Sequence, residues 1–134
     1  MDYERTWLPE AVPRAADPLF QHLLDTYASE TNKTASVWTE LRDDQLAFRP
    51  HLRSSTVREI LAHQLLSERR FFAEFIGLEE PAAALVLPPP EATGVAPFRE
   101  RLIALAAPRL AALAGRDREF WLAPVPFFDV TRER

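Results

Sequence analysis

The sequence predicts an all-α protein built as one up-and-down helical bundle, and three observations carry this prediction. Apolar residues recur at three- and four-residue spacing over three long stretches, as in amphipathic helices. Proline-rich segments separate these stretches. No segment of useful length alternates apolar and polar residues as a half-exposed strand does. The 134 residues, 47% hydrophobic and 27% charged, have the size and composition of a single globular domain, residues 1–134.

The chain is expected to begin with an extended arm over residues 1–16. Pro9 and Pro13 interrupt this segment, and little apolar periodicity runs through it. Trp7 and Leu8 are the candidates for an apolar anchor that holds the arm on the bundle.

The first helix is predicted over residues 17–42. Asp17 provides an N-cap side chain, and Pro18 stands at the first helical position. Proline is tolerated there because a backbone N–H at that position makes no hydrogen bond within the helix. One stripe of helical spacing follows, made of Phe20, Leu23, Leu24, Tyr27, Thr31, Thr34, Trp38 and Leu41.

The second helix is predicted over residues 56–76. Arg49 precedes a proline and is therefore pushed out of the helical region, which places a connection before the helix. Thr56 and Glu59 have the three-residue spacing of a capping box, which marks the helix start. Gly77 is a suitable C-cap.

The third helix is predicted over residues 97–114, after an irregular crossing segment at residues 78–96. The crossing segment holds Pro81 and three consecutive prolines, so it is expected to be neither helix nor strand. Pro108 falls inside the helical pattern and removes a backbone donor, which predicts a kink or a break there.

The sequence predicts that a fourth helix is missing or only begun: the chain reaches Arg134 where that helix would start, with Asp129 or Thr131 as its cap. The three apolar stripes are wide enough to need neighbours on two sides, as in a four-helix bundle. Either the chain is a shortened form of a longer parent, or a second protomer covers the gap. We expect a homodimer or larger assembly with an apolar contact. The aromatic residues near both ends of this region are expected to pack as core and cap: Phe71, Phe72, Phe75, Phe120, Trp121, Phe127 and Phe128.

Charge and residue usage exclude several classes of function. Sixteen basic against twenty acidic residues give a net charge of -4 without a basic stripe, which argues against nucleic-acid binding. The chain has no cysteine, so disulfides, a thiolate nucleophile and cysteine-ligated metals are excluded. Neither an export signal nor a membrane-spanning apolar run is visible, so a cytoplasmic location without membrane contact is expected.

The segments WTELRDDQLAFRP (38–50) and SSTVREILAH (54–63) resemble the end of the first helix and the opening of the second in the DinB-like family of small four-helix bundles. The resemblance implies that His63 occupies the position of one of three metal ligands, with a divalent ion, zinc or nickel, as cofactor. It implies that the other two ligands are a His-x-x-x-His pair on the fourth helix, which is missing here or only begun at the C-terminus. Family members include thiol-dependent transferases, so a small-molecule or thiol substrate is implied.

The residues themselves leave several alternatives open. Glu59 stands one helical turn before His63 and is a candidate carboxylate ligand or hydrogen-bonding partner of that histidine, or else half of an ordinary helix-surface pair. His63 itself is equally interpretable as a solvated surface histidine. His22 and His51 are badly placed to join it on one ion. The function is thus either a divalent-metal-binding relative of the transferases with an incomplete site, or a non-catalytic helical module for dimerisation or small-molecule binding.

Overall fold

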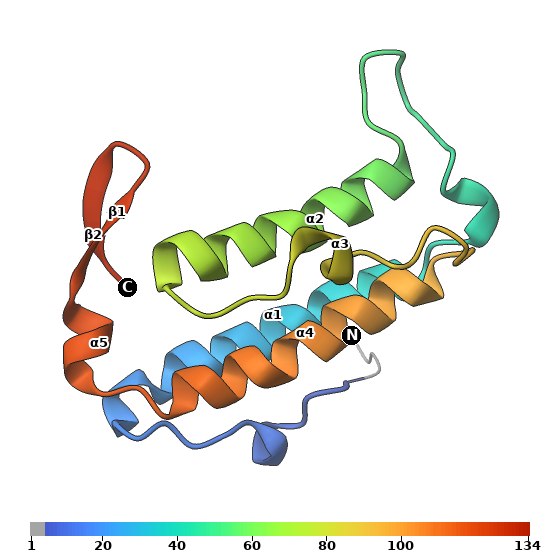
Figure 1. Ribbon diagram of the computed structural model, residues 1–134. Helices are drawn as coiled ribbons and strands as arrows, with labels where there is room; N and C mark the ends of the chain where they lie inside the picture. The colour runs from blue at the N-terminus through green and yellow to red at the C-terminus, as the bar shows by residue number, and fades with distance from the viewer. Residues whose placement is uncertain (1–4) are drawn as a thin grey trace.

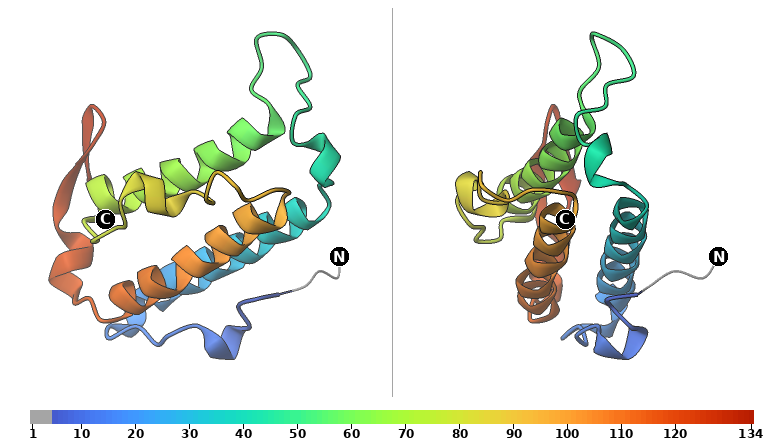
Figure 2. Two further views of the ribbon diagram at one scale, coloured as in Figure 1. Left: turned by 45° about the vertical axis from the view of Figure 1, so that its right-hand side comes forward. Right: turned by 90° about the vertical axis from the view of Figure 1, so that its right-hand side faces the viewer.

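Three long helices form the body of the protein in the computed structural model, which describes residues 5–134. They are α1 (Gln21–Thr39), α2 (Val57–Phe71) and α4 (Ala96–Ala114). Helices α1 and α4 lie side by side, and α2 lies across one side of this pair (Figures 1 and 2). Figure 1 shows α2 running antiparallel to α1, as the sequence predicted, and α4 running in the same direction as α2. None of the helices in the described residues is long and apolar enough to cross a membrane.

The local start signals are confirmed at both predicted caps. Asp17 accepts a hydrogen bond from the Leu19 N–H at 3.0 Å and opens the 3-10 turn η2 (Pro18–Phe20), which leads directly into α1. Thr56 and Glu59 form the predicted capping box, in which each side chain accepts from the other residue's backbone N–H. The α-helical part ends sooner than residue 76, because Phe72–Ile76 form a π-helical turn, η4, before Gly77 takes a left-handed φ of 80°.

Helix α4 is not broken at Pro108, contrary to one of the two outcomes expected there. It runs without interruption to Ala114. Proline cannot donate to the carbonyl of Ala104, four residues earlier, but both residues are exposed, so water can satisfy that carbonyl.

The crossing segment is not wholly irregular, which corrects the prediction for residues 78–96. It contains one helical turn, α3 (Ala83–Val86), between Pro81 and Pro88. Alanine and leucine favour helix there, and Val86 is fully buried in the core beside α2. The burial of the Val86 side chain holds α3 against the core.

The C-terminal region contains a β-hairpin where a helix was expected to begin, so the prediction of a helix cap at Asp129 or Thr131 is wrong. A short helix, α5 (Arg118–Leu122), leads into strands β1 (Pro124–Phe127) and β2 (Val130–Glu133). The strands are antiparallel, with Phe127 opposite Val130 and Pro124 opposite Glu133. Two prolines in β1 disfavour helix, and Phe128 turns the chain with a φ of 55°. This hairpin is the sole sheet in the described residues.

The core has two clusters, one toward each end of the α1–α4 pair. One gathers side chains of α1, α2 and α4, among them Trp38, Leu61, Leu65, Phe98 and Leu102. The other joins the start of α1 to the end of α4 and to α5, where Phe20 stacks on Trp121 at 5.4 Å between ring centroids. The second cluster also receives Val12 and Trp7 from the N-terminal segment.

The N-terminal segment is fastened to α1 by one buried amide side chain. Asn32, 4% exposed, accepts a hydrogen bond from the Trp7 N–H at 2.9 Å and donates one to the Trp7 carbonyl at 2.8 Å. Trp7 packs against the core, whereas Leu8 is 46% exposed. Trp7 is therefore the anchor and Leu8 is not. Residues 1–4 of the predicted arm lie outside the described residues.

Candidate functional site

The side chain of His63, the candidate metal ligand, is exposed on α2. Its Nε2 lies 3.2 Å from the hydroxyl of Ser67, one turn further along the helix. His22 and His51 are exposed as well, and each has a ring nitrogen engaged by nearby backbone: the Leu19 carbonyl in the first case and the Arg53 N–H in the second. The three histidines are thus held in separate local contacts.

Glu59 is turned toward the start of α2. Its Oε2 accepts the Thr56 N–H at 2.6 Å and lies 3.7 Å from Nη2 of Arg49. The backbone N–H of Thr56 is the main reason why the pKa of Glu59 lies below its ordinary value. Its carboxylate therefore serves as a cap.

The donor groups do not fit the three-ligand metal centre that the family resemblance implies. Within residues 5–134, no three His, Cys, Asp or Glu side chains are grouped so that they could hold one ion. A tight divalent site takes three or four protein ligands in one place. The assignment of His63 as a ligand remains a prediction.

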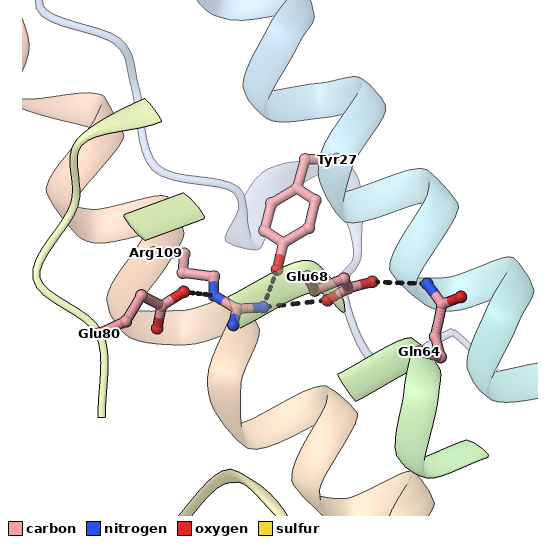
Figure 3. A network of polar contacts seen from close by, with 5 residues as sticks. All are labelled: Tyr27, Gln64, Glu68, Glu80 and Arg109. Carbon is pink, nitrogen blue, oxygen red and sulfur yellow. Dashed lines mark hydrogen bonds and ion pairs between the residues drawn. The ribbon is translucent and has the colours of Figure 1, made fainter. Parts of the chain in front are cut away.

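A buried ion-pair network stands in the middle of the bundle (Figure 3). Arg109 of α4, whose side chain is 2% exposed, donates to Glu80 at 2.5 Å, to Glu68 of α2 at 2.9 Å and to the hydroxyl of Tyr27 of α1 at 3.2 Å. Glu68 accepts a further bond from Gln64 at 3.2 Å. One guanidinium thereby connects α1, α2, α4 and the crossing segment.

The electrostatics of the network follow from its burial. Loss of water raises the pKa of Tyr27 to about 12, so its hydroxyl stays protonated. Burial also raises the pKa of Glu68, against the opposing effect of Gln64 and Arg109. Burial lowers the pKa of Arg109, but its contacts with Tyr27 and Glu80 outweigh this and raise the pKa overall. Arg109 stays charged, and its Cζ atom also lies over the Phe72 ring, 4.5 Å from the ring centroid.

The network was not predicted from the sequence, although one signal was present. Arg109 is the one charged residue in the apolar run from Leu102 to Ala114. A charged residue inside a buried helix face requires a partner. Its partners lie 41 and 29 residues away in the sequence, so no local pattern could name Glu68 and Glu80.

A sequence model of the DinB superfamily matches residues 26–133. This chain belongs to the DinB superfamily. Comparison with curated proteins and comparison with solved structures gave no match. The family match and the helical body agree with the resemblance noted in the two segments at residues 38–63.

In this DinB-superfamily chain, four phenylalanines meet where the hairpin rests against the end of α2. We call Phe71, Phe75, Phe127 and Phe128 the aromatic surface. Phe75 is central to it, with ring centroids 5.2 Å from Phe71, 4.8 Å from Phe127 and 5.2 Å from Phe128. The sequence predicts that these rings pack as core and cap, but three of them are open to solvent: Phe71 and Phe127 are each 38% exposed and Phe128 is 64% exposed.

A hollow of about 360 Å³ opens beside the aromatic surface. Its apolar lining consists of Phe71, Phe75, Ile76, Val125 and Phe127, and its charged lining consists of Arg132, Glu133 and Arg134. Arg134 fixes the geometry, since its guanidinium donates to the Ile76 and Phe120 carbonyls at 2.9 Å each. An apolar hollow with a charged rim is suited to bind an apolar group, and the charged rim can orient the partner molecule to which that group belongs.

Glu68 gives the stability of this bundle a specific pH dependence. A carboxyl whose pKa is higher in the folded than in the unfolded chain binds its proton more tightly when folded. Its contribution to stability is therefore fully present below its unfolded pKa, about 4.3, and is lost as the pH rises through the folded value.

We expect the free energy of unfolding of the wild type to fall relative to that of Glu68→Gln as the pH is raised through this window. Urea unfolding of both proteins across the pH series gives the difference, and most other titrating groups cancel. A difference that stays constant, or that grows in favour of the wild type, would show that burial does not raise the pKa of Glu68 in the folded protein.

Proposed function

We propose that this DinB-superfamily chain is a non-catalytic binding module that takes up an apolar group of a partner at its aromatic surface. One observation carries the proposal: Phe71, Phe75 and Phe127 line a hollow, Phe128 packs against all three rings, and three of the four phenylalanines are at least 38% exposed. Exposed large apolar side chains scattered singly need no explanation, but a contiguous patch with a polar rim is typical of an interaction site.

The backbone at Phe128 supports this proposal. Its φ of 55° lies in the left-handed region, where a hairpin turn normally carries glycine, asparagine or aspartate. Holding a bulky residue there costs about 1–3 kcal/mol, and such strain clusters at functional positions. We attribute the presence of Phe128 to the use of its ring, because the fold would gain stability from a smaller residue.

The buried network supports a binding function over a reaction in the bundle interior. Its carboxylates contact Arg109, and its tyrosine stays protonated at neutral pH. General acid–base catalysis needs a group with a pKa near the working pH and within reach of a substrate. The network instead connects α1, α2, α4 and the crossing segment, and Arg109 also lies over the ring of Phe72 after the end of α2.

The aromatic surface can be tested with an apolar fluorescent probe, 1-anilinonaphthalene-8-sulfonate. We expect the wild type to bind the probe saturably, and the double variant Phe127→Ser with Phe128→Ser to lose at least about tenfold in affinity, since each buried aromatic contributes more than about 1 kcal/mol. Leu85→Ser is the matched control, because Leu85 is also 64% exposed but lies in α3. Equal affinities for the double variant and the control would refute the proposed site.

A second candidate function is divalent-metal binding of the kind found in thiol-dependent transferases. The exposed imidazole of His63 supports it, with one ring nitrogen beside a serine hydroxyl. We propose that zinc or nickel meets one protein ligand here, because Glu59 is committed to the helix cap, and that binding is consequently weak and thiol transfer undetectable. A cytoplasmic location belongs to the same proposal.

For His63, we expect His63→Ala to abolish whatever zinc or nickel binding the wild type has. Calorimetric titration of metal-free protein measures this, and His22→Ala is the matched control, since His22 is also exposed and on a helix. Tight binding that is equal in wild type and His63→Ala would show that the metal is held elsewhere.

A further inference from the structure

The loop at residues 46–56 presents apolar side chains to solvent, as the aromatic surface does. It carries two prominent apolar side chains, Leu52 at 90% exposure and Phe48 at 60%. Arg49, His51 and Arg53 stand beside them, so the apolar tip has a basic surround.

The loop is held in a defined shape, so its tip is presented rigidly. Its base is closed by the Val57 N–H donating to the Phe48 carbonyl at 3.1 Å and the Arg58 N–H donating to the Leu46 carbonyl at 3.0 Å. Leu46 is 5% exposed and packs in the core. Near the tip, Arg49 donates to the Leu52 carbonyl at 3.3 Å. A preformed tip loses little conformational entropy when it binds.

The loop and the hairpin stand at opposite ends of α2 and project to the same side of it. Figure 1 shows the loop rising from the start of α2 and the hairpin rising from α5 beside the other end of α2, both on the side of α2 away from α1 and α4, and Figure 2 agrees. A two-fold axis that crosses α2 at right angles, midway between the loop and the hairpin, places the loop of one copy opposite the hairpin of the other. Two copies packed face to face and antiparallel along α2 would thus bring each Leu52 to the other copy's aromatic surface.

The charges exposed along α2 fit the same arrangement. Glu59 and Arg70 are exposed toward opposite ends of the helix, where Glu59 also caps Thr56 and Arg70 also pairs with Glu74 at 2.9 Å in its own chain. Antiparallel packing would set each of them beside its opposite charge in the second copy. Arg53 in the loop and Glu74 in η4, both exposed, would form a second such pair, and the midpoints of both pairs fall close to Gln64 in the sequence. One axis therefore satisfies both charge pairs and the apolar contacts, as an isologous interface requires.

We propose that the partner of the aromatic surface is a second copy of this chain, docked antiparallel across α2, with the 46–56 loop of each copy seated against the aromatic surface of the other. This inference rests on the proposed function, since it names the group that the hollow receives: the side chain of Leu52, with Phe48 beside it. Each copy donates one loop and receives one, so the interface closes at two subunits.

The absence of cysteine from the sequence allows a clean cross-linking test. Single variants Leu52→Cys and Phe128→Cys are mixed at equal micromolar concentrations and treated with a short bismaleimide. Within one chain the two positions flank α2, whose 15 residues span roughly 22 Å, so a short linker cannot join them intramolecularly. Each variant alone, and a mixture of Phe128→Cys with Leu85→Cys, are the controls.

We expect at least tenfold more covalent dimer in the mixture of Leu52→Cys and Phe128→Cys than in any control. Adding Arg53→Glu to the Leu52→Cys variant should abolish this dimer. Equal cross-linking in the controls, or none in the mixture, would overturn this interface. Probe binding that persists at the aromatic surface without cross-linking would overturn the second copy as partner and leave the proposed function standing. Loss of both would remove both proposals.

Discussion

Replacing Arg109 with methionine is expected to destabilise the protein by about 3–5 kcal/mol, because it leaves buried carboxylates without their counter-charge. Arg109 and Glu80 are 2% and 3% exposed, and Glu68 is 20% exposed, so water cannot take over the lost bonds. Methionine keeps much of the volume, which separates the loss of charge from the loss of packing. Urea unfolding at neutral pH gives the free energy difference.

Two further variants make the reason testable. Adding Glu68→Gln and Glu80→Gln to Arg109→Met removes the unpaired charges, so the triple variant should regain most of the lost stability. Arg70→Met removes the exposed ion pair between Arg70 and Glu74, whose atoms are 2.9 Å apart, and should cost less than about 1 kcal/mol. An Arg109→Met variant as stable as Arg70→Met would show that the network does not hold the bundle.

Replacing Gly94 with alanine is expected to cost at least about 2 kcal/mol, for two independent reasons. Gly94 has a φ of 86°, which strains any residue with a Cβ. An added Cβ would also stand 2.8 Å from the carboxylate of Asp43, which accepts the Val95 N–H at 2.9 Å. The substitution therefore displaces the group that ties the start of α4 to the turn after α1.

Gly115→Ala is the matched control for this prediction. Gly115 has no left-handed φ, and the atom nearest to an added Cβ is 4.0 Å away, so the change should be neutral or slightly stabilising. The double variant Asp43→Ala with Gly94→Ala should cost less than the sum of its single changes, because the overlap disappears with the carboxylate. Thermal unfolding of the four proteins decides this, and strict additivity would leave φ strain as the sole cause.

Features set by neighbouring residues could be predicted from the sequence, and features set by distant ones could not. Asp17 with Pro18, and Thr56 with Glu59, act within one helical turn, so their spacing alone marked the helix starts. The three apolar stripes gave the helical body in the same way. Arg109 depends on partners in other elements, which sequence periodicity does not show.

The C-terminal hairpin was missed for a different reason. Pro124 and Pro126 suggested irregular chain, and the turn rests on Phe128, a residue that turn preferences would not select. The ring of Phe127 in β1 packs on Phe71, the last residue of α2, and on Phe75 in η4, and these contacts support the strands. The missing fourth helix led to the prediction that a partner covers apolar side chains. Where those side chains lie could not be predicted from the sequence, because the aromatic surface forms only when the hairpin packs against the end of α2.

The most direct test of the aromatic surface as the binding site is the rate at which a cysteine there is alkylated as the protein concentration rises. If the surface binds a partner copy, Phe128→Cys should react more slowly as association increases, while Leu85→Cys, which starts equally exposed, should keep a constant rate. A protected Phe128→Cys beside an unchanged Leu85→Cys is the result that we predict. Rates that are equally independent of concentration at both positions, in protein that sedimentation shows to be associated, would contradict the central claim.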